Sequence, residues 1–117
     1  MRDHRNLRAF QLADELVLAV YRATKLLPQE EMFGLTSQLR RAVVSIASNI
    51  VEGCARESQP DFVRFLDIAF ASSREVEYQL TIAERLGYLP PEEAKVIGAK
   101  ATETAKVIYG LLKSVRN

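Results

Sequence analysis

The sequence has very little of the residue types that build metal sites and nucleophilic active sites. Its 117 residues include one cysteine, Cys54, and one histidine, His4. A single cysteine excludes an internal disulfide and a metal site made of several cysteines, and it favours a reducing compartment. We interpret Cys54 as a small buried apolar residue near a helix end. The alternative, a catalytic nucleophile, lacks a base because His4 lies in the N-terminal tail.

Long apolar runs are also missing from the sequence. No run approaches the ~20 residues that a membrane-spanning helix needs. The charged N-terminal residues 1–6 lack the apolar centre of a secretory signal. We therefore expect a soluble, cytoplasmic protein with no membrane partner.

The chain has no clear surplus of charge of either sign. Its 16 basic and 15 acidic residues give a formal net charge of +1. This balance argues against a nucleic-acid binder that works through overall charge, but it leaves room for a local basic patch. Length and composition are those of one globular domain, which we assign to residues 1–117.

Four segments have the three- and four-residue periodicity of amphipathic helices, and none shows the two-residue alternation of a strand. The predicted helices cover residues 7–27, 35–55 and 60–86, and then about 91–115. Because the links between them are short, consecutive helices should run antiparallel. The predicted fold is all-α, an antiparallel up-down-up-down four-helix bundle.

Several residues mark the predicted helix boundaries. Pro28 ends the first helix, because proline cannot continue a helix. Ser58, with an acid three residues later, indicates a capping box before the third helix, and Gly87 indicates a glycine C-cap after it. Gly98 and Gly110 weaken the fourth helix by roughly 1 kcal/mol each relative to alanine, and we predict that they mark close helix approaches.

The second predicted helix has three distinct faces on a helical wheel of ~100° per residue. The core face consists of Leu35, Leu39, Ala42, Val43, Ile46 and Ile50. A polar stripe beside it consists of Gln38, Arg41, Ser45, Asn49 and Glu52. The remaining face is small or apolar and consists of Ser37, Val44, Ala47, Ser48, Val51 and Ala55. A helix with so little polar surface is usually covered on more than one side, which predicts an oligomer with Val44, Ala47 and Val51 at the subunit interface.

Two interpretations compete for the polar stripe. In the first, Arg41 and Glu52 flank Ser45 and Asn49 and bind a polar ligand. In the second, which we favour, the stripe is a buried polar network whose partners on the third helix are Ser72, Glu75 and Gln79. Unpaired buried polar groups cost about 1–3 kcal/mol each, so such a network must be hydrogen-bonded. The predicted network consists of Gln38, Arg41, Ser45, Asn49, Glu52 and Glu75.

The same residues carry a family resemblance that extends along nearly the whole chain. The most specific motif is Leu35-Thr36-Ser37-Gln38-Leu39-Arg40-Arg41-Ala42, then Ser45-Ile46, then Asn49-Ile50-Val51-Glu52-Gly53. Further agreement lies at Phe10, Ala13, Leu16, Tyr21, Arg56, Phe62, Phe65-Leu66, Ala69, Ser72, Glu75, Leu80 and Leu86-Gly87-Tyr88-Leu89. The sequence resembles the bacterial 23S rRNA intervening-sequence proteins, also called S23-like or four-helix-bundle proteins. It departs from their pattern at Cys54 and Ala71.

The resemblance implies a four-helix bundle that assembles into a homopentamer. Some members of the family are encoded within insertions in 23S rRNA genes, and most have no established biochemical activity. A related group, the accessory proteins of diversity-generating retroelements, binds nucleic acid and a reverse transcriptase as a basic pentamer. The family name therefore does not establish a ribosomal role.

Catalysis is the least favoured class of function. The predicted bundle has no histidine, no glycine-rich phosphate loop and no Glu-x-x-His pair of the kind that binds two metals in helical bundles. We expect no catalytic residues, no cofactor, no metal and no small-molecule substrate.

Nucleic-acid binding is a sharper hypothesis, because the predicted topology gathers basic residues at one end of the bundle. These candidate contacts to RNA or DNA are Arg2, Arg5, Arg8, Arg56, Arg64, Lys113 and Arg116. Seven cations against Asp3, Glu57 and Asp61 leave a local surplus of four. Repeated around a ring, such an end would attract phosphate, although no exposed aromatic residue for base stacking can be identified. The alternatives are a pair of ordinary solvated bundle ends, which we favour, and a scaffold that binds other proteins.

Overall fold

The computed structural model describes residues 2–116, and within that range it contains helices and no strand. In chain order the elements are the 3₁₀-helix η1 (His4–Asn6), α1 (Arg8–Thr24), the 3₁₀-helix η2 (Gln29–Glu31), α2 (Leu35–Cys54), α3 (Gln59–Arg85) and α4 (Pro91–Arg116). The prediction of four α-helices is thus confirmed. None of the helices in residues 2–116 combines the length and apolar character needed to cross a membrane.

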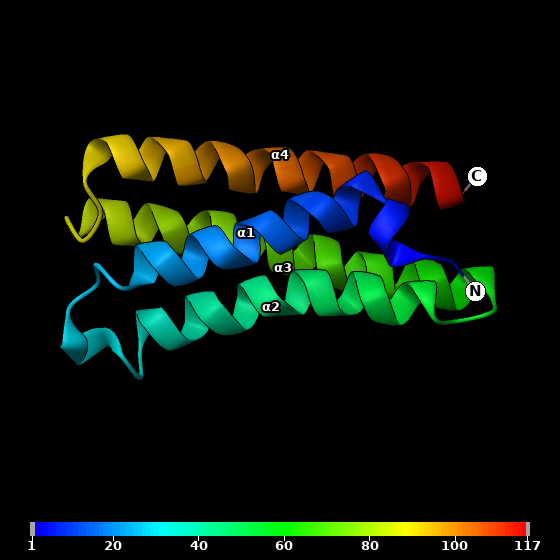
Figure 1. Cartoon of the computed structure of the whole chain (residues 1–117), viewed down its shortest axis with the longest axis horizontal. Coiled ribbons are helices and arrows are strands. Elements are labelled where there is room, and N and C mark those ends of the chain that lie inside the picture. The colour runs from blue at the N-terminus through cyan, green and yellow to red at the C-terminus, as the bar shows by residue number, and fades with distance from the viewer. Residues whose placement is uncertain (1, 117) are drawn as a thin grey trace.

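The four helices lie side by side along the longest dimension of a molecule of 43 × 24 × 19 Å (Figure 1). Each helix has two neighbours, because α2 contacts α1 and α3 while α4 contacts α3 and α1. The α1–α2 and α3–α4 links lie at one end of the molecule, and the α2–α3 link lies at the other end together with the N- and C-terminal segments (Figure 1). We call these the link end and the terminal end.

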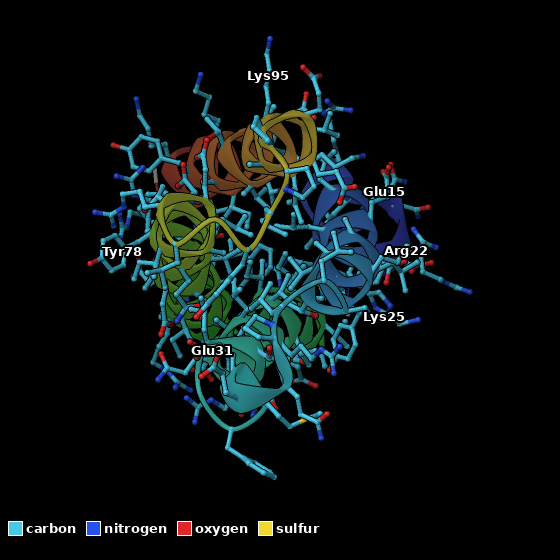
Figure 2. All side chains as sticks on the ribbon, turned by 90° about the vertical axis from the view of Figure 1, so that its left-hand side faces the viewer. Glu15, Arg22, Lys25, Glu31, Tyr78 and Lys95 are labelled. Carbon is cyan, nitrogen blue, oxygen red and sulfur yellow. The ribbon has the colours of Figure 1, made fainter. Side chains whose placement is uncertain are left out.

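The core fills the space enclosed by the four helices, as the view along the molecule in Figure 2 shows. Every helix contributes fully buried side chains to it, such as Leu16 of α1, Ile46 of α2, Leu66 of α3 and Ile108 of α4. All six residues predicted for the core face of the second helix are buried. Burial of apolar surface at this spacing is the main stabilising contribution to such a fold.

The first helix is shorter than predicted, because α1 ends at Thr24 and not at Leu27. The Thr24 hydroxyl donates to the Val20 carbonyl at 2.8 Å, and the next three backbone N–H groups bond to carbonyls only three residues back. The residue before a proline is sterically disfavoured in the α conformation, so Pro28 already disfavours helix at Leu27. The tighter turns then lead into η2.

Ser58 and Gly87 act as the predicted caps of the third helix, although within residues 2–116 the Ser58 N–H does not donate back to the Asp61 carboxylate, as a full capping box requires. The Ser58 side chain accepts a hydrogen bond from the Asp61 N–H at 3.2 Å and so caps α3. After α3, Gly87 adopts a positive φ of 76°. The Gly87 N–H then donates to the Glu84 carbonyl, and the Tyr88 N–H donates to the Ala83 carbonyl. This pair of bonds is the Schellman arrangement, which glycine favours because it has no Cβ to clash.

The prediction that Gly98 and Gly110 mark close helix approaches is wrong within the chain. A Cβ added at either position would meet nothing within 4 Å. The close approach lies instead at Gly53, near the end of α2. A Cβ there would lie 3.0 Å from Cβ of Phe65 and 3.2 Å from Cδ1 of Phe62, so α2 and α3 pack tightly only because this position has no side chain.

Candidate functional site

The polar stripe of α2 makes its best-formed contacts where α2 lies against α3. The hydroxyls of Ser45 and Ser72 are 2.9 Å apart and share a hydrogen bond. Nδ2 of Asn49 donates to the Ser45 carbonyl at 2.8 Å and to the Ser45 hydroxyl at 3.0 Å. Ser72 is buried, and Ser45 and Asn49 are half-buried. Since neither a hydroxyl nor a carboxamide is an effective base at neutral pH, this group is suited to joining two helices and not to activating a nucleophile.

A second polar contact continues along α3 on the same side. Nε2 of the buried Gln79 side chain donates to the Glu75 carboxylate at 3.2 Å, while Glu75 itself is exposed. Among the residues that the structure describes, none donates to the buried Oε1 of Gln79. Of the three predicted partners on α3, Ser72 bonds to the stripe, whereas Glu75 and Gln79 bond to each other in a separate group.

The other three stripe residues do not join the Ser45 group within residues 2–116. Gln38, Arg41 and Glu52 are all exposed. Glu52 lies 3.8 Å from the guanidinium of Arg56, one helical turn further along the chain. The single chain thus brings together only part of the network that the sequence predicts.

The outer face of α2 keeps its apolar residues at the surface. Val44 and Val51 are 37% and 36% exposed, and Ala47 is half-buried. Arg40 borders this face and reaches across to α1, where its Nε donates to the Thr24 hydroxyl at 2.9 Å. The core face of α2 is already complete without Val44 and Val51. These two valines therefore form apolar surface that a single chain does not bury.

Most of the basic residues predicted at the terminal end are ion-paired. The pairs are Arg5–Asp3 at 2.9 Å, Arg8–Glu103 at 3.3 Å, Arg56–Glu52 at 3.8 Å, Arg64–Asp61 at 3.6 Å and Arg116–Asp67 at 2.6 Å. The partners Glu52, Asp67 and Glu103 lie within the helices and were not counted at the predicted end. Including them sets seven cations against six carboxylates, so the local surplus falls from four to one. Of the predicted set, Arg2 and Lys113 form no ion pair with any other residue in 2–116.

Three arginines at this end also stack on phenylalanine rings. The guanidinium carbon of Arg2 lies 4.0 Å from the ring centre of Phe62. Those of Arg56 and Arg64 lie 5.0 and 4.5 Å from the ring centre of Phe65. The N-terminal segment is fixed here as well, because the Arg2 N–H donates to the Cys54 carbonyl at 3.1 Å. These contacts hold the arginines in place and reduce their freedom to reach a phosphate.

The environment of Cys54 matches its interpretation as a buried apolar residue. The side chain is 1% exposed and lies in the core cluster. Burial raises the pKa of the Cys54 thiol above its ordinary value, which keeps the thiol protonated and unreactive at neutral pH. Within residues 2–116, no three His, Cys, Asp or Glu side chains gather as metal ligands.

Two surface features had no signal that we recognised in the sequence. Phe33 in the α1–α2 link is 96% exposed, and Tyr78 and Tyr109 are 61% and 47% exposed; Figure 2 shows Tyr78 pointing away from the bundle. The second feature is an open groove of about 390 Å³ between α1 and α4. An aromatic residue inside a polar link, between Pro28 and Gly34, is a signal that could have identified Phe33.

The fold and these polar contacts define a small all-helical protein in which several polar side-chain contacts join one helix to another. The chain belongs to the 23S rRNA-intervening sequence protein family, whose model matches residues 5–110. It is similar to a solved protein of unknown function from the S23 ribosomal protein family of Bacteroides thetaiotaomicron VPI-5482. The two are 28% identical, with a TM-score of 0.82 over 90% of this chain and 95% of the other. No match is found among curated proteins.

Proposed function

We propose that this protein is a non-catalytic, self-assembling module, an antiparallel up-down-up-down bundle that works in the cytoplasm as a homo-oligomer, with a pentamer as the expected form. The observation that carries the proposal is the outer face of α2, where Val44 and Val51 are each more than one third exposed. The residues between and beside them are small, such as Ala47 and Ser48. A smooth face of this kind lets a second helix approach closely.

The polar stripe supports the same proposal. A stable interface buries about 800 Å² per partner, far more than two half-exposed valines supply. The interface must therefore include neighbouring positions, and Gln38, Arg41 and Glu52 lie next to the apolar face. We propose that these three side chains complete their hydrogen bonds across the interface, so that the network predicted within one chain forms between subunits.

The proposal is tested by the mass of the protein in solution. Val44→Glu and Val51→Glu each place a charge in the proposed interface, and both should shift the sedimenting mass toward the 13.2 kDa monomer. Circular dichroism should show that the helices remain. Ala71→Glu, at an exposed position of α3, is the matched control and should keep the wild-type mass. A wild-type protein that sediments as a monomer at micromolar concentration would overturn the proposal.

A second candidate function is binding of RNA or DNA at the terminal end. The observation in its favour is the gathering of Arg2, Arg56, Arg64 and Lys113 there, repeated by any cyclic assembly. The ion pairs described above weaken it, because a paired arginine must give up its carboxylate to bind phosphate. The competing scaffold role, in which the oligomer binds another protein, needs no free cations.

Binding of single-stranded RNA as a function of salt separates these two roles. If the terminal end binds RNA, affinity should fall steeply between about 50 and 200 mM salt. Alanine at Arg2, Arg5 and Arg8 together should weaken binding and flatten the salt dependence. A wild-type protein without salt-sensitive binding to RNA would reject this candidate and leave the scaffold role.

A further inference from the structure

Phe33 is the most exposed large apolar residue in the part of the chain that the structure describes. The link that carries it is nevertheless well anchored. The Glu31 carboxylate accepts hydrogen bonds from the Leu35 N–H at 3.0 Å and from the Tyr88 hydroxyl at 2.8 Å. The Gly34 N–H donates to the Glu31 carbonyl at 2.9 Å. The phenyl ring is therefore presented to solvent by a fixed backbone, which is the arrangement of an interaction site and not of a frayed loop.

The groove between α1 and α4 has an apolar lining suited to an aromatic ring. Its volume of about 390 Å³ is open to solvent, and its floor is made of alanine, valine and isoleucine side chains. The lining residues are Ala19, Arg22 and Ala23 of α1, and Glu92, Glu93, Val96, Ile97 and Lys100 of α4. Val96 is 57% exposed, so the groove is an apolar surface that the chain leaves uncovered.

The ring and the groove lie at the same end of the molecule but belong to different sides of it. Figure 1 places the last turns of α1, the first turns of α4 and the α1–α2 link all at the link end. The link leads directly into α2, whereas the groove lies between α1 and α4. We propose that Phe33 of one copy enters the α1–α4 groove of a second copy. This inference rests on the proposed self-assembly and names the second surface of the subunit contact.

Symmetry supports a second copy as the occupant of the groove. A rotation about an axis parallel to the helices keeps every atom at its own height, so a contact between copies joins only surfaces at matching heights. The α1–α2 link, which carries Phe33, and the helix turns that form the groove both lie at the link end, as this condition requires (Figure 1). The Phe33 link is also continuous in sequence with the outer face of α2 that carries Val44. The charged residues that line the groove, Arg22, Lys100, Glu92 and Glu93, balance one another, so the contact rests on the apolar lining and not on charge.

The contact proposed here is head-to-tail, since each copy uses two different surfaces. The competing arrangement is a two-fold contact in which the α2 faces of two copies pack against each other. In that arrangement the α1–α4 groove stays open and substitutions in it leave the assembly unchanged. The two arrangements therefore predict different behaviour for groove variants.

Two variants and their mixture test the proposal. Phe33→Asp removes the ring, and Val96→Glu blocks the groove, both at exposed positions where the fold tolerates polar side chains. By sedimentation, each variant alone should associate about 10- to 100-fold more weakly than wild type, the effect expected for losing one buried aromatic or aliphatic contact. Phe33→Leu, which keeps an apolar side chain, and Ala99→Glu, an exposed position of α4 outside the groove, are the matched controls and should assemble.

Mixing the two variants is the decisive measurement. The Val96→Glu protein retains an intact Phe33, and the Phe33→Asp protein retains an intact groove, so the two mixed variants should form a one-to-one complex more tightly than either variant associates with itself. Failure to recombine would overturn the pairing of ring and groove. Wild-type mass in both variants would overturn it too, while leaving assembly through α2 intact. A monomeric wild type would overturn the proposed self-assembly itself.

Discussion

At the scale of single residues, Gly53 has a role that its position in the sequence does not reveal. It lies in the last turn of α2, where glycine is usual as a helix end signal, yet α2 continues through Cys54. Its importance is steric, because Phe62 and Phe65 of α3 occupy the space that a Cβ would need. The same phenylalanines support the stacked arginines. The absence of a side chain at Gly53 therefore allows the packing that positions these rings and arginines at the terminal end.

We expect Gly53→Ala to destabilise the protein by about 1–2 kcal/mol. Overpacking against the Phe65 Cβ costs roughly 1–3 kcal/mol, and the better helix propensity of alanine returns up to about 1 kcal/mol. Gly110→Ala is the control, because its added methyl meets nothing within 4 Å, and it should stabilise the protein by roughly 0.5–1 kcal/mol. Denaturant unfolding of the two variants measures both effects, and equal shifts would show that the contact at Gly53 relaxes freely.

At the scale of secondary-structure elements, the start of α2 depends on a side chain from the preceding link. The N-cap residue, Gly34, has no side chain with which to cap the helix. The Glu31 carboxylate takes over by accepting from the Leu35 N–H, and the Tyr88 hydroxyl from the α3–α4 link binds its other oxygen. Those two hydrogen bonds lower the pKa of Glu31 below its ordinary value of 4.5. The two links at this end are thereby tied together.

This arrangement predicts an acid-dependent stability. Because the folded-state pKa of Glu31 is lower than its unfolded value, its stabilising contribution is present above about pH 4.5 and is lost as the pH falls through the lowered folded value. Asp3, whose pKa is lowered by hydrogen bonds from Arg5, adds to the same trend. Glu31→Gln should therefore lose less stability than wild type on acidification. Urea unfolding between about pH 6 and 3 measures this, and parallel curves would contradict it.

The elements that sequence reasoning located correctly are those whose signals are local. Ser58 caps α3 and Gly87 ends it through contacts within a few residues. The spacing of apolar residues likewise identified the core face of α2. The capping role of Glu31, in contrast, depends on Tyr88, 57 residues away. Contacts of that range leave no periodic trace in the sequence.

At the scale of the whole molecule, the arrangement of charges was the least predictable property. Counting residues near the predicted helix ends gave one strongly basic end. The structure places Asp67 of α3 against Arg116 of α4 and Glu103 of α4 against Arg8 of α1, and both pairs join different helices. Such partners follow only from the helix packing. The polar stripe was predicted only in part, because the sequence does not show which of its residues meet a neighbouring helix. Ser45 faces Ser72, whereas Arg41 faces solvent.

The proposed assembly has a thermodynamic consequence for the whole protein. Association that occurs only in the folded state stabilises it by mass action, so the midpoint of thermal unfolding should rise with protein concentration. The Val51→Glu variant, with its interface charged, should show a midpoint that is independent of concentration. Circular dichroism melts over a hundredfold range of concentration compare the two, and a constant wild-type midpoint would argue for a monomer.

The burial of Cys54 makes this thiol a reporter on motion at the terminal end. A thiol-specific reagent requires both access and the thiolate form, and the native fold limits both. Labelling must therefore wait for a local opening of the terminal end that exposes the thiol, an opening of the kind that hydrogen exchange detects. As the sequence has no other cysteine, the rate of labelling measures the opening equilibrium of this one region without any engineered probe.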